Sequence, residues 1–283
     1  MLPVLLNLKF IKIYTFGVFL VLAFFWGGFI LWRNIRLTSQ KEEEIFDGLF
    51  LSLAGGLFVS RAVFVILNFD KFGFDLLKFI LINGYPGLSL YGAIFGGFLS
   101  LYFYCGFNKI KFRQIADYFI TPLFVSLVFG KLGSFFSGSE VAAKTNFFLS
   151  VKYIGYDGLR HLTALYESMF FLLGAYLSYR FIFEVRKEKL PNGFVFYFFG
   201  WYFALIYSIF DRLKVSRLYL IPYTEDKLKL SFNFIVSSIL LLTLSLYFFY
   251  YFRDYLLTYG KRTYKKITKK ISGAFGKRGK KTQ

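Results

Sequence analysis

Two basic side chains, Arg61 and Lys131, stand inside long apolar runs of this chain. A charged group in hydrocarbon costs about 2.5 kcal/mol or more, so such a residue is expected to face a cavity or a partner. Two interpretations stay open for both residues. Each is either a structural cation, ion-paired or reaching the membrane surface, or part of a site for the phosphate of a lipid.

The residues after Lys131 favour a phosphate site. Ser134, Ser137 and Gly138 follow it at short spacing. Small residues let backbones approach closely, and hydroxyl and amide groups donate hydrogen bonds to phosphate oxygens. A lysine at this place acts as a point charge, without the two-pronged donor geometry of an arginine.

Four further residues could transfer protons or orient a substrate. His161 is the only histidine; it is either a general base, since imidazole titrates near neutral pH, or a polar residue at a membrane boundary. Glu167 lies six residues further on, and Tyr14 and Tyr91 are either packing aromatics or members of a site. Cys105 has no neighbour that would activate a thiolate, so we expect it to pack.

Composition indicates what must position these residues. The chain has 283 residues, of which 57% are hydrophobic and 24% aromatic, and its net charge is +19. This hydrophobicity excludes a disordered chain. One cysteine excludes a disulfide scaffold. Because the chain also has only one histidine, a metal site is not expected. A polytopic all-α membrane protein remains.

Seven apolar stretches are long enough to cross a bilayer, which takes about 20 residues. We expect them at about 12–32, 46–68, 84–105, 115–137, 162–183, 191–210 and 231–252. Residues 1–252 then form one transmembrane domain, and residues 253–283 form a tail.

The tail sets the expected orientation. It carries eleven basic residues and one acid, which predicts a cytoplasmic C-terminus and, with seven spans, an N-terminus outside. The predicted cytoplasmic segments hold 21 Lys and Arg residues against 12 on the other side. The tail favours contact with anionic lipid head groups over nucleic acid.

Six passages of the sequence, in this order, resemble motifs of one family. They are Ile11–Tyr14, Ser60–Val65, Leu90–Gly96, Gly130–Glu140, Arg160–Glu167 and Ser216–Leu220. The most specific passage, Arg-His-Leu-Thr-Ala-Leu-Tyr-Glu from Arg160 to Glu167, is similar to the Arg-His-Pro-Ser/Thr-Gln-Leu-Tyr-Glu of the bacterial prolipoprotein diacylglyceryl transferases. The passage after Gly130 resembles that family's signature, Gly-Arg-x-Gly-Asn-Phe-x-Asn-x-Glu-x-x-Gly. The resemblance covers about residues 8–252.

The resemblance implies a fold of seven spans in the bacterial inner membrane. It also implies an activity, the first step of lipoprotein maturation. A diacylglyceryl group moves from phosphatidylglycerol to the lipobox cysteine thiol in the signal peptide of a preprolipoprotein, and glycerol phosphate leaves. Phosphatidylglycerol, other membrane lipid and preprolipoproteins are the implied partners, with no metal, organic cofactor or nucleic acid.

The same resemblance implies roles for the candidate residues. Arg61 and Lys131 would hold the phosphate, and His161 or Tyr91 would take or relay the thiol proton. Glu167 would orient a cation or the histidine. The residues that would contact the lipid head group or line its entrance are Tyr14, Ser134, Ser137 and Gly138.

This chain departs from the family's motifs at several places. Lys131 replaces an arginine, which keeps the charge but not the two-pronged geometry. Ser134 and Ser137 replace asparagines, and Tyr91 replaces a histidine. A tyrosine is a poor base at neutral pH, because its ordinary pKa is about 10.

Two further departures concern a glutamate and an arginine of the family. The glutamate falls on Ser139, with Glu140 one place later. The arginine, in span six, falls on Ile206. Arg212 is the expected substitute for that arginine if the local register differs.

Two other functions stay open. Tyr91 and Ile206, standing where functional residues are expected, would suit a catalytically inactive relative that binds phospholipid or lipopeptide. A small transporter would use Asp117, Lys131 and Glu167 as a polar path, although the sequence shows no inverted repeat.

Overall fold

The computed structural model describes residues 2–8, 11–38, 40–82, 84–220 and 231–253. Within these residues seven helices are long and apolar enough to cross a membrane, which confirms the all-α polytopic fold. They are α1 (Thr15–Ile35), α2 (Glu42–Leu67), α5 (Leu90–Phe107), α6 (Phe112–Ser137), α7 (Thr163–Arg186), α8 (Phe194–Phe210, continued by the 3₁₀ turn η1, Asp211–Leu213) and a last helix, Phe232–Arg253. The predicted tail, from residue 254 on, lies outside the described residues.

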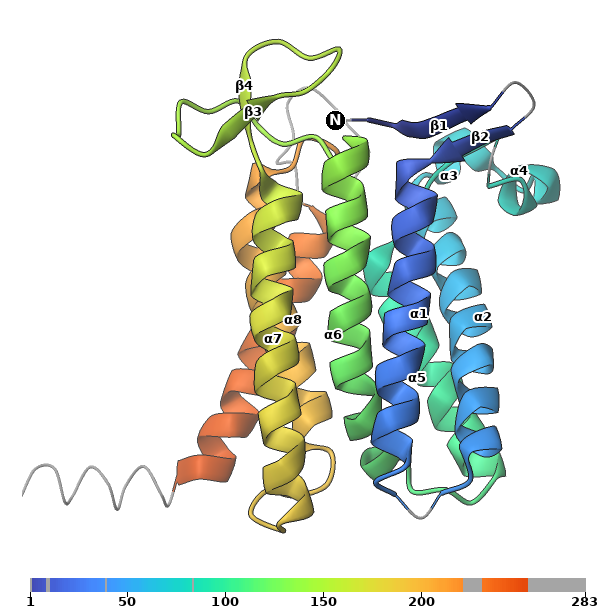
Figure 1. Ribbon diagram of the computed structural model, residues 1–283, viewed down its shortest axis with the longest axis vertical. Helices are drawn as coiled ribbons and strands as arrows, with labels where there is room; N and C mark the ends of the chain where they lie inside the picture. Colours follow the sequence, from blue (N-terminus) through green and yellow to red (C-terminus); the bar gives the residue numbers. More distant parts are fainter. Residues whose placement is uncertain (1, 9–10, 39, 83, 221–230, 254–283) are drawn as a thin grey trace, which may run out of the picture.

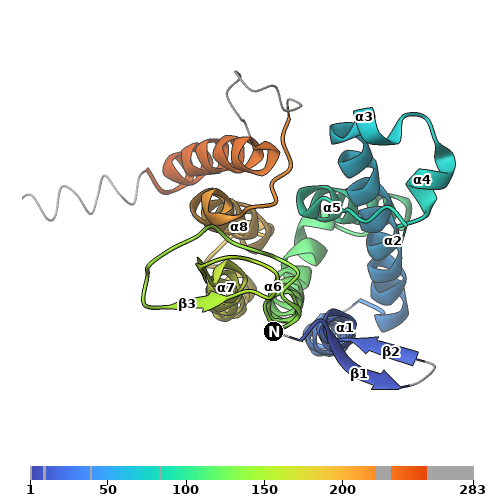
Figure 2. The same ribbon diagram turned by 90° about the horizontal axis from the view of Figure 1, so that it is seen from above.

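Helix α6 lies in the middle of the bundle. Figure 2 shows α1, α2 and α5 on one side of it and α7, α8 and the last helix on the other. Helix α6 packs against α1 and α7, and α2 packs against α5. Residues of α6 can therefore contact both halves of the molecule.

Two hairpins mark one end of the bundle, which we call the hairpin end (Figure 1). Strand β1 (Val4–Leu8) pairs antiparallel with β2 (Ile11–Tyr14), and β3 (Ser150–Lys152) pairs antiparallel with β4 (Leu159–His161). The short helices α3 (Phe69–Phe72) and α4 (Leu76–Ile80) lie at the same end. The last helix runs away from this end, so the first and last described residues lie at opposite ends of the bundle, as an odd number of spans requires.

Helices α2 and α5 approach closely because their contact surface is made of small residues. A Cβ atom added to Gly96 would lie 2.5 Å from the Cβ of Val59 and 2.8 Å from the carbonyl oxygen of Gly55. At Gly92 it would lie 2.9 Å from the Cα of Ser60. Only glycine fits at these contacts, and they place the end of α2 beside the loop that leads into α5.

The expected span 84–105 begins later in the structure, at Leu90. Ser89 caps α5, because its hydroxyl accepts a hydrogen bond from the backbone N–H of Gly92. Its own N–H donates to the carbonyl of Ser60. The residues before Ser89, which include Pro86, form a loop at the hairpin end instead of the first turns of a span.

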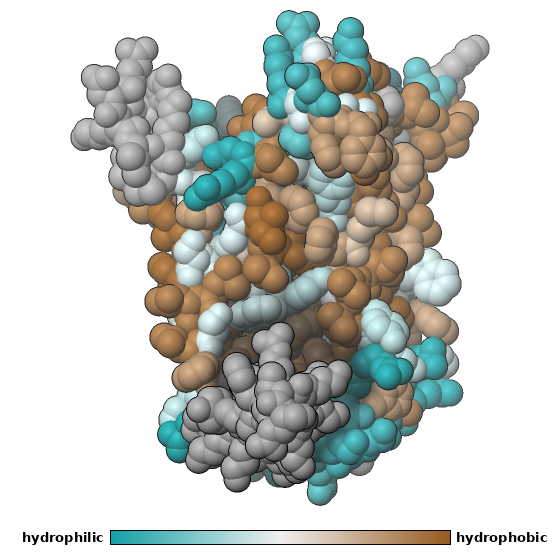
Figure 3. Space-filling model, turned by 90° about the vertical axis from the view of Figure 1, so that its left-hand side faces the viewer, coloured by the Kyte–Doolittle hydropathy of each residue, from teal (hydrophilic) through white to brown (hydrophobic). Residues whose placement is uncertain are grey.

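The middle of the bundle has the surface of a membrane protein. Figure 3 shows apolar side chains over the middle of one face, with hydrophilic side chains toward its two ends. Large exposed side chains such as Phe24, Phe58, Leu172 and Leu242 belong to the spanning helices. Inside, a core rich in aromatic rings surrounds α8, where Phe199, Phe203 and Tyr207 stack along one face.

Candidate functional site

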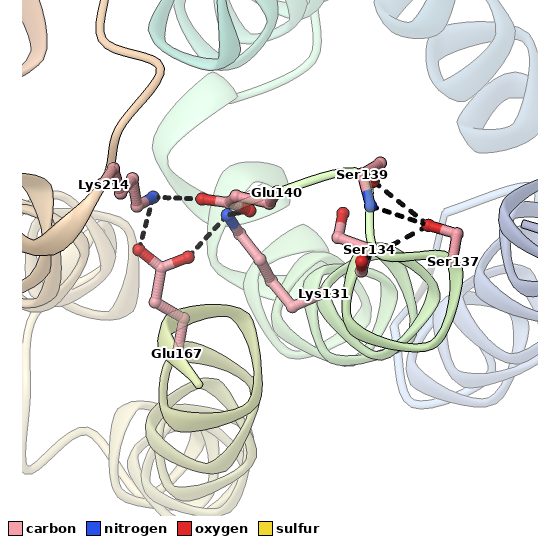
Figure 4. A network of polar contacts seen from close by, with 7 residues as sticks. All are labelled: Lys131, Ser134, Ser137, Ser139, Glu140, Glu167 and Lys214. Atoms are coloured by element: carbon pink, nitrogen blue, oxygen red, sulfur yellow. Dashed lines mark hydrogen bonds and ion pairs between the residues drawn. The ribbon is translucent and has the colours of Figure 1, made fainter. Parts of the chain in front are cut away.

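Four charged side chains form a closed ring at the hairpin end (Figure 4). The ammonium of Lys131 lies 2.7 Å from Glu140 and 2.5 Å from Glu167. The ammonium of Lys214 lies 2.7 Å from the other carboxylate oxygen of Glu140 and 2.5 Å from the other oxygen of Glu167. Each carboxylate therefore bridges both lysines, and we call this set the four-charge ring.

The end of α6 brings Glu140 back to Lys131. Gly138 adopts φ +72°, the left-handed conformation that favours glycine at the end of a helix. The turn is held by Ser137, whose hydroxyl lies 3.1 Å from that of Ser139, and by the N–H of Ser139, which donates to the carbonyl of Ser134. Glu140 thus points back over the last turns of α6 toward Lys131.

The segment after α8 brings in Lys214. The N–H of Val215 donates to the carbonyl of Val141, and the N–H of Ala143 donates to the carbonyl of Leu213. These bonds pair the residues that follow Glu140 with those on both sides of Lys214. Glu167 reaches the same place from the early turns of α7, which packs against α6.

The four-charge ring is buried, and it packs against the aromatic side chain of Tyr207. Lys131, Lys214 and Glu167 are 8%, 6% and 0% exposed. The ring of Tyr207 lies beneath both lysines, with its centroid 4.4 Å from the Lys214 ammonium and 5.6 Å from that of Lys131. Cation–π attraction of this kind strengthens when the cation is removed from water.

Electrostatic attraction favours the charged forms of Glu140 and Lys214. Burial alone would raise the pKa of Glu140, but the charges of Lys131 and Lys214 outweigh it and hold that pKa at about 2. The pKa of Lys214 is raised: burial and Lys131 oppose its charge, but Tyr207, Glu167 and Glu140 favour it. Two ammoniums and two carboxylates at this site give no net charge.

Tyr91 packs against Tyr207, the aromatic residue that contacts the four-charge ring. Its aromatic ring is 5.6 Å from that of Tyr207 and 5.3 Å from that of Phe203, in edge-to-face contacts. Its hydroxyl lies 2.5 Å from the hydroxyl of Ser237 on the last helix. Tyr91 is 6% exposed, so it supports Tyr207 from inside the bundle.

Arg61 lies in a different part of the hairpin end. It is 2% exposed, and its guanidinium donates to the backbone carbonyls of Lys78, Phe79 and Gly87 at 2.7, 3.0 and 2.8 Å. It also lies 5.0 Å from the ring centroid of Phe72. Arg61 therefore ties the loop between α2 and α5 to the end of α2.

The other predicted residues lie outside the ring. His161 ends β4, half-buried, with its ring 6.3 Å from that of Phe147. Tyr14, at the end of β2, is 58% exposed. Arg212 is exposed and lies over the ring of Phe234, whereas Ile206 is buried in the aromatic core.

The sequence motifs do not single out Lys214 or Glu140 for the site. Lys214 lies in extended backbone after η1, beyond the end of α8, so no spacing along a helix identifies it from the sequence. Glu140 stands one place beyond the glutamate of the family's signature. The left-handed turn at Gly138 accommodates that offset, because it directs Ser139 toward Ser137 and Glu140 toward Lys131.

Comparison with known proteins gives the same family as the sequence motifs. The family model of the prolipoprotein diacylglyceryl transferases matches residues 3–251. A phosphatidylglycerol–prolipoprotein diacylglyceryl transferase of Finegoldia magna is 25% identical over 233 residues, which is 82% of this chain and 90% of the relative. Those of Caldanaerobacter subterraneus subsp. tengcongensis and Wigglesworthia glossinidia brevipalpis are 25% and 26% identical, over 71% and 87% of this chain and 74% and 92% of their own lengths. The chain therefore belongs to the prolipoprotein diacylglyceryl transferase family.

Proposed function

We propose that this protein transfers the diacylglyceryl group of phosphatidylglycerol to the lipobox cysteine thiol of a preprolipoprotein. Two findings support the activity. The chain belongs to the family, and it matches most of the length of relatives that are named for this reaction. The structural observation that supports it most is the pair of buried lysines, Lys131 and Lys214, bridged by carboxylates at one end of the bundle.

The two lysines would bind the phosphate of the lipid. In the reaction the cysteine sulfur attacks the glycerol carbon that carries the phosphate ester. The bond between that carbon and the ester oxygen breaks, and glycerol phosphate leaves with the bonding electrons. Cations fixed beforehand at the place where this negative charge develops stabilise the transition state, and this effect is larger away from water.

The thiol must lose its proton for this attack. We propose that His161 accepts this proton, because its imidazole is half-buried at the hairpin end and makes no hydrogen bond to another described residue. Tyr91 suits this role less well, since its buried hydroxyl is held by Ser237. We assign Ser134, Ser137 and Gly138 to head-group contacts beside Lys131.

Three predicted substrate contacts receive narrower roles in the proposal. Arg61 acts as a positioning residue through the loop that it ties to α2. Tyr14 lies at the exposed boundary where lipid would enter. Arg212, outside the ring and exposed, would contact head groups at the surface.

The alternative of a catalytically inactive relative is not favoured. It rests on Tyr91 and Ile206, which stand where a histidine and an arginine of the family are expected. In place of that arginine, Lys214 supplies a second buried cation from the segment after α8. The protein is a multi-pass membrane protein. We propose that it lies in the bacterial inner membrane with the hairpin end outside, where secreted preprolipoproteins emerge.

The mass of a lipobox peptide tests the activity. The peptide is incubated with the purified protein in liposomes that contain phosphatidylglycerol. We expect a gain of one diacylglyceryl group, absent when the peptide cysteine is replaced by serine. An unchanged mass, with the Finegoldia magna relative active in the same liposomes, would contradict the proposal.

A further inference from the structure

The four-charge ring presents a problem for an anionic lipid. Two lysines and two glutamates cancel, and every described contact of the two ammoniums with a carboxylate is to Glu140 or Glu167. A phosphodiester that entered this buried place as it stands would add an unbalanced negative charge in a medium of low dielectric constant. One carboxylate must therefore leave the lysines before the phosphate can bind them.

The carboxylate of Glu140 contacts the two lysines in the way that a bound phosphodiester would. One of its carboxylate oxygens lies 2.7 Å from Lys131 and the other lies 2.7 Å from Lys214. A phosphodiester also presents two equivalent charged oxygens on one atom, and it carries the same single charge. It could therefore replace the carboxylate without changing the charge of the site or the number of its ion pairs.

The two glutamates differ in how easily they could leave. The side chain of Glu167 is fully buried on a helix, whereas that of Glu140 is 17% exposed on the loop after Gly138. The backbone on both sides of Glu140 is held by hydrogen bonds at Ser139 and Val141, so an outward movement of its carboxylate would be a rotation of the side chain. A displaced Glu140 regains water, which offsets part of the cost of leaving the lysines.

We infer that Glu140 is an exchangeable counter-ion that occupies the phosphate site of the empty protein, and that the phosphodiester of the lipid replaces it between Lys131 and Lys214. Glu167 remains as the permanent counter-ion. This inference rests on the proposed function for the identity of the lipid, but the exchange itself is a property of binding. Removing Glu140 should therefore strengthen lipid binding, which is the opposite of what removing a ligand-binding residue does.

Binding of phosphatidylglycerol to protein in phosphatidylcholine nanodiscs tests the exchange. We expect Glu140→Gln to bind phosphatidylglycerol about tenfold or more tightly than the wild type, since the competing charge is gone. Glu42→Gln is the matched control: it removes the same charge at the other end of the bundle, where Glu42 pairs with Arg36. It should leave the affinity unchanged. An equal or weaker affinity of Glu140→Gln would overturn the inference.

Glu167→Gln separates exchange from a simple change in net charge. It removes one charge from the same ring but leaves Glu140 in the phosphate site, held by lysines that have lost their other partner. We expect no comparable gain in affinity. A gain as large as that of Glu140→Gln would show that net charge alone controls binding and would overturn the assignment to Glu140.

A measurement on the unmodified chain covers the case in which these variants do not fold. A water-soluble carbodiimide labels accessible carboxylates, and mass spectrometry locates the label. Saturating phosphatidylglycerol should increase labelling of Glu140 and leave Glu167 unlabelled, while phosphatidylcholine alone should change neither. Unchanged labelling of Glu140 would contradict the exchange. Because none of these readouts needs turnover, a failure of transferase activity would be seen separately, in the mass of the lipobox peptide.

Discussion

At the scale of single residues, the site is organised around charges that balance one another inside the bundle. Lys131 keeps the charge of the arginine that the family's motif has at this place. Glu140 and Glu167 together balance the charges of Lys131 and Lys214. Breaking a buried ion pair by removing one partner typically costs about 3–5 kcal/mol. Each member of the ring therefore affects stability as well as binding.

Acid should destabilise the protein through Glu140. Its pKa is about 2 in the folded protein, against an ordinary value of 4.5. Because the folded-state pKa is the lower one, the stabilisation from Glu140 is present at pH values above the ordinary pKa of 4.5 and is lost as the pH falls toward 2. Thermal unfolding in detergent between pH 6 and pH 3 should show a smaller loss for Glu140→Gln than for the wild type. Asp157→Asn, in the loop between β3 and β4, should keep the wild-type slope; equal slopes for all three proteins would contradict the assignment.

Arg61 should control the loop before α5. Arg61→Lys keeps the charge but cannot donate to three carbonyls in one plane, and we expect a loss of about 3 kcal/mol and faster protease cleavage within residues 73–88. Limited proteolysis with mass spectrometry measures this. Lys78→Ala is the matched control, because it removes a side chain of the same loop and leaves the backbone carbonyl that Arg61 binds. Cleavage of Arg61→Lys at the wild-type rate would exclude the anchoring role.

The sequence identified Lys131 and Glu167 as candidates, since charges are rare in apolar runs. Lys214 could not be selected in the same way, because it lies just after a span, where a lysine is ordinary. What makes it part of the site is the pairing of Leu213 and Val215 with residues 141–143, a contact between segments about 70 residues apart in the chain. Spacing along one helix does not reveal such a contact.

At the scale of elements, the position of the site depends on how helices approach one another. Hydrophobic runs predicted all seven spans. The start of α5 differed because Ser89 and Arg61 hold the preceding residues as a loop, which hydropathy does not detect. The close contact of α2 and α5 places that loop beside Arg61.

Replacing a glycine by alanine should lower the stability of the protein strongly at the contact of α2 with α5 and little in α1. Gly96→Ala would place a Cβ atom 2.5 Å from that of Val59, so we expect a loss of about 1–3 kcal/mol of unfolding free energy. Gly28→Ala is the control: apart from its chain neighbours and the nearby backbone of α1, no atom of the described residues lies within 4 Å of its added Cβ, and alanine favours the helix. Unfolding temperatures of the two variants in detergent measure the difference. Equal stability of both would show that the glycine contact is not what brings α2 and α5 together.

At the scale of the whole molecule, the orientation of the bundle decides whether the site meets secreted proteins. We expect the hairpin end outside and the connection of α7 and α8 in the cytoplasm. In a Cys105→Ala background, a membrane-impermeant thiol reagent should label Asp157→Cys in intact cells. It should label Glu188→Cys, which lies after the end of α7, only after lysis. The reverse pattern would contradict the orientation predicted from the basic residues of the tail.

The measurement that tests the central claim most directly is the initial rate of transfer to a lipobox peptide by two variants whose residues lie two positions apart. Lys214 belongs to the four-charge ring, and Arg212 is the exposed cation that the sequence suggests. We predict that Lys214→Ala loses about 10²-fold or more of the rate, and that Arg212→Ala stays within about threefold of the wild type. A wild-type rate for Lys214→Ala, or an inactive Arg212→Ala, would contradict the proposal that the ring holds the phosphate.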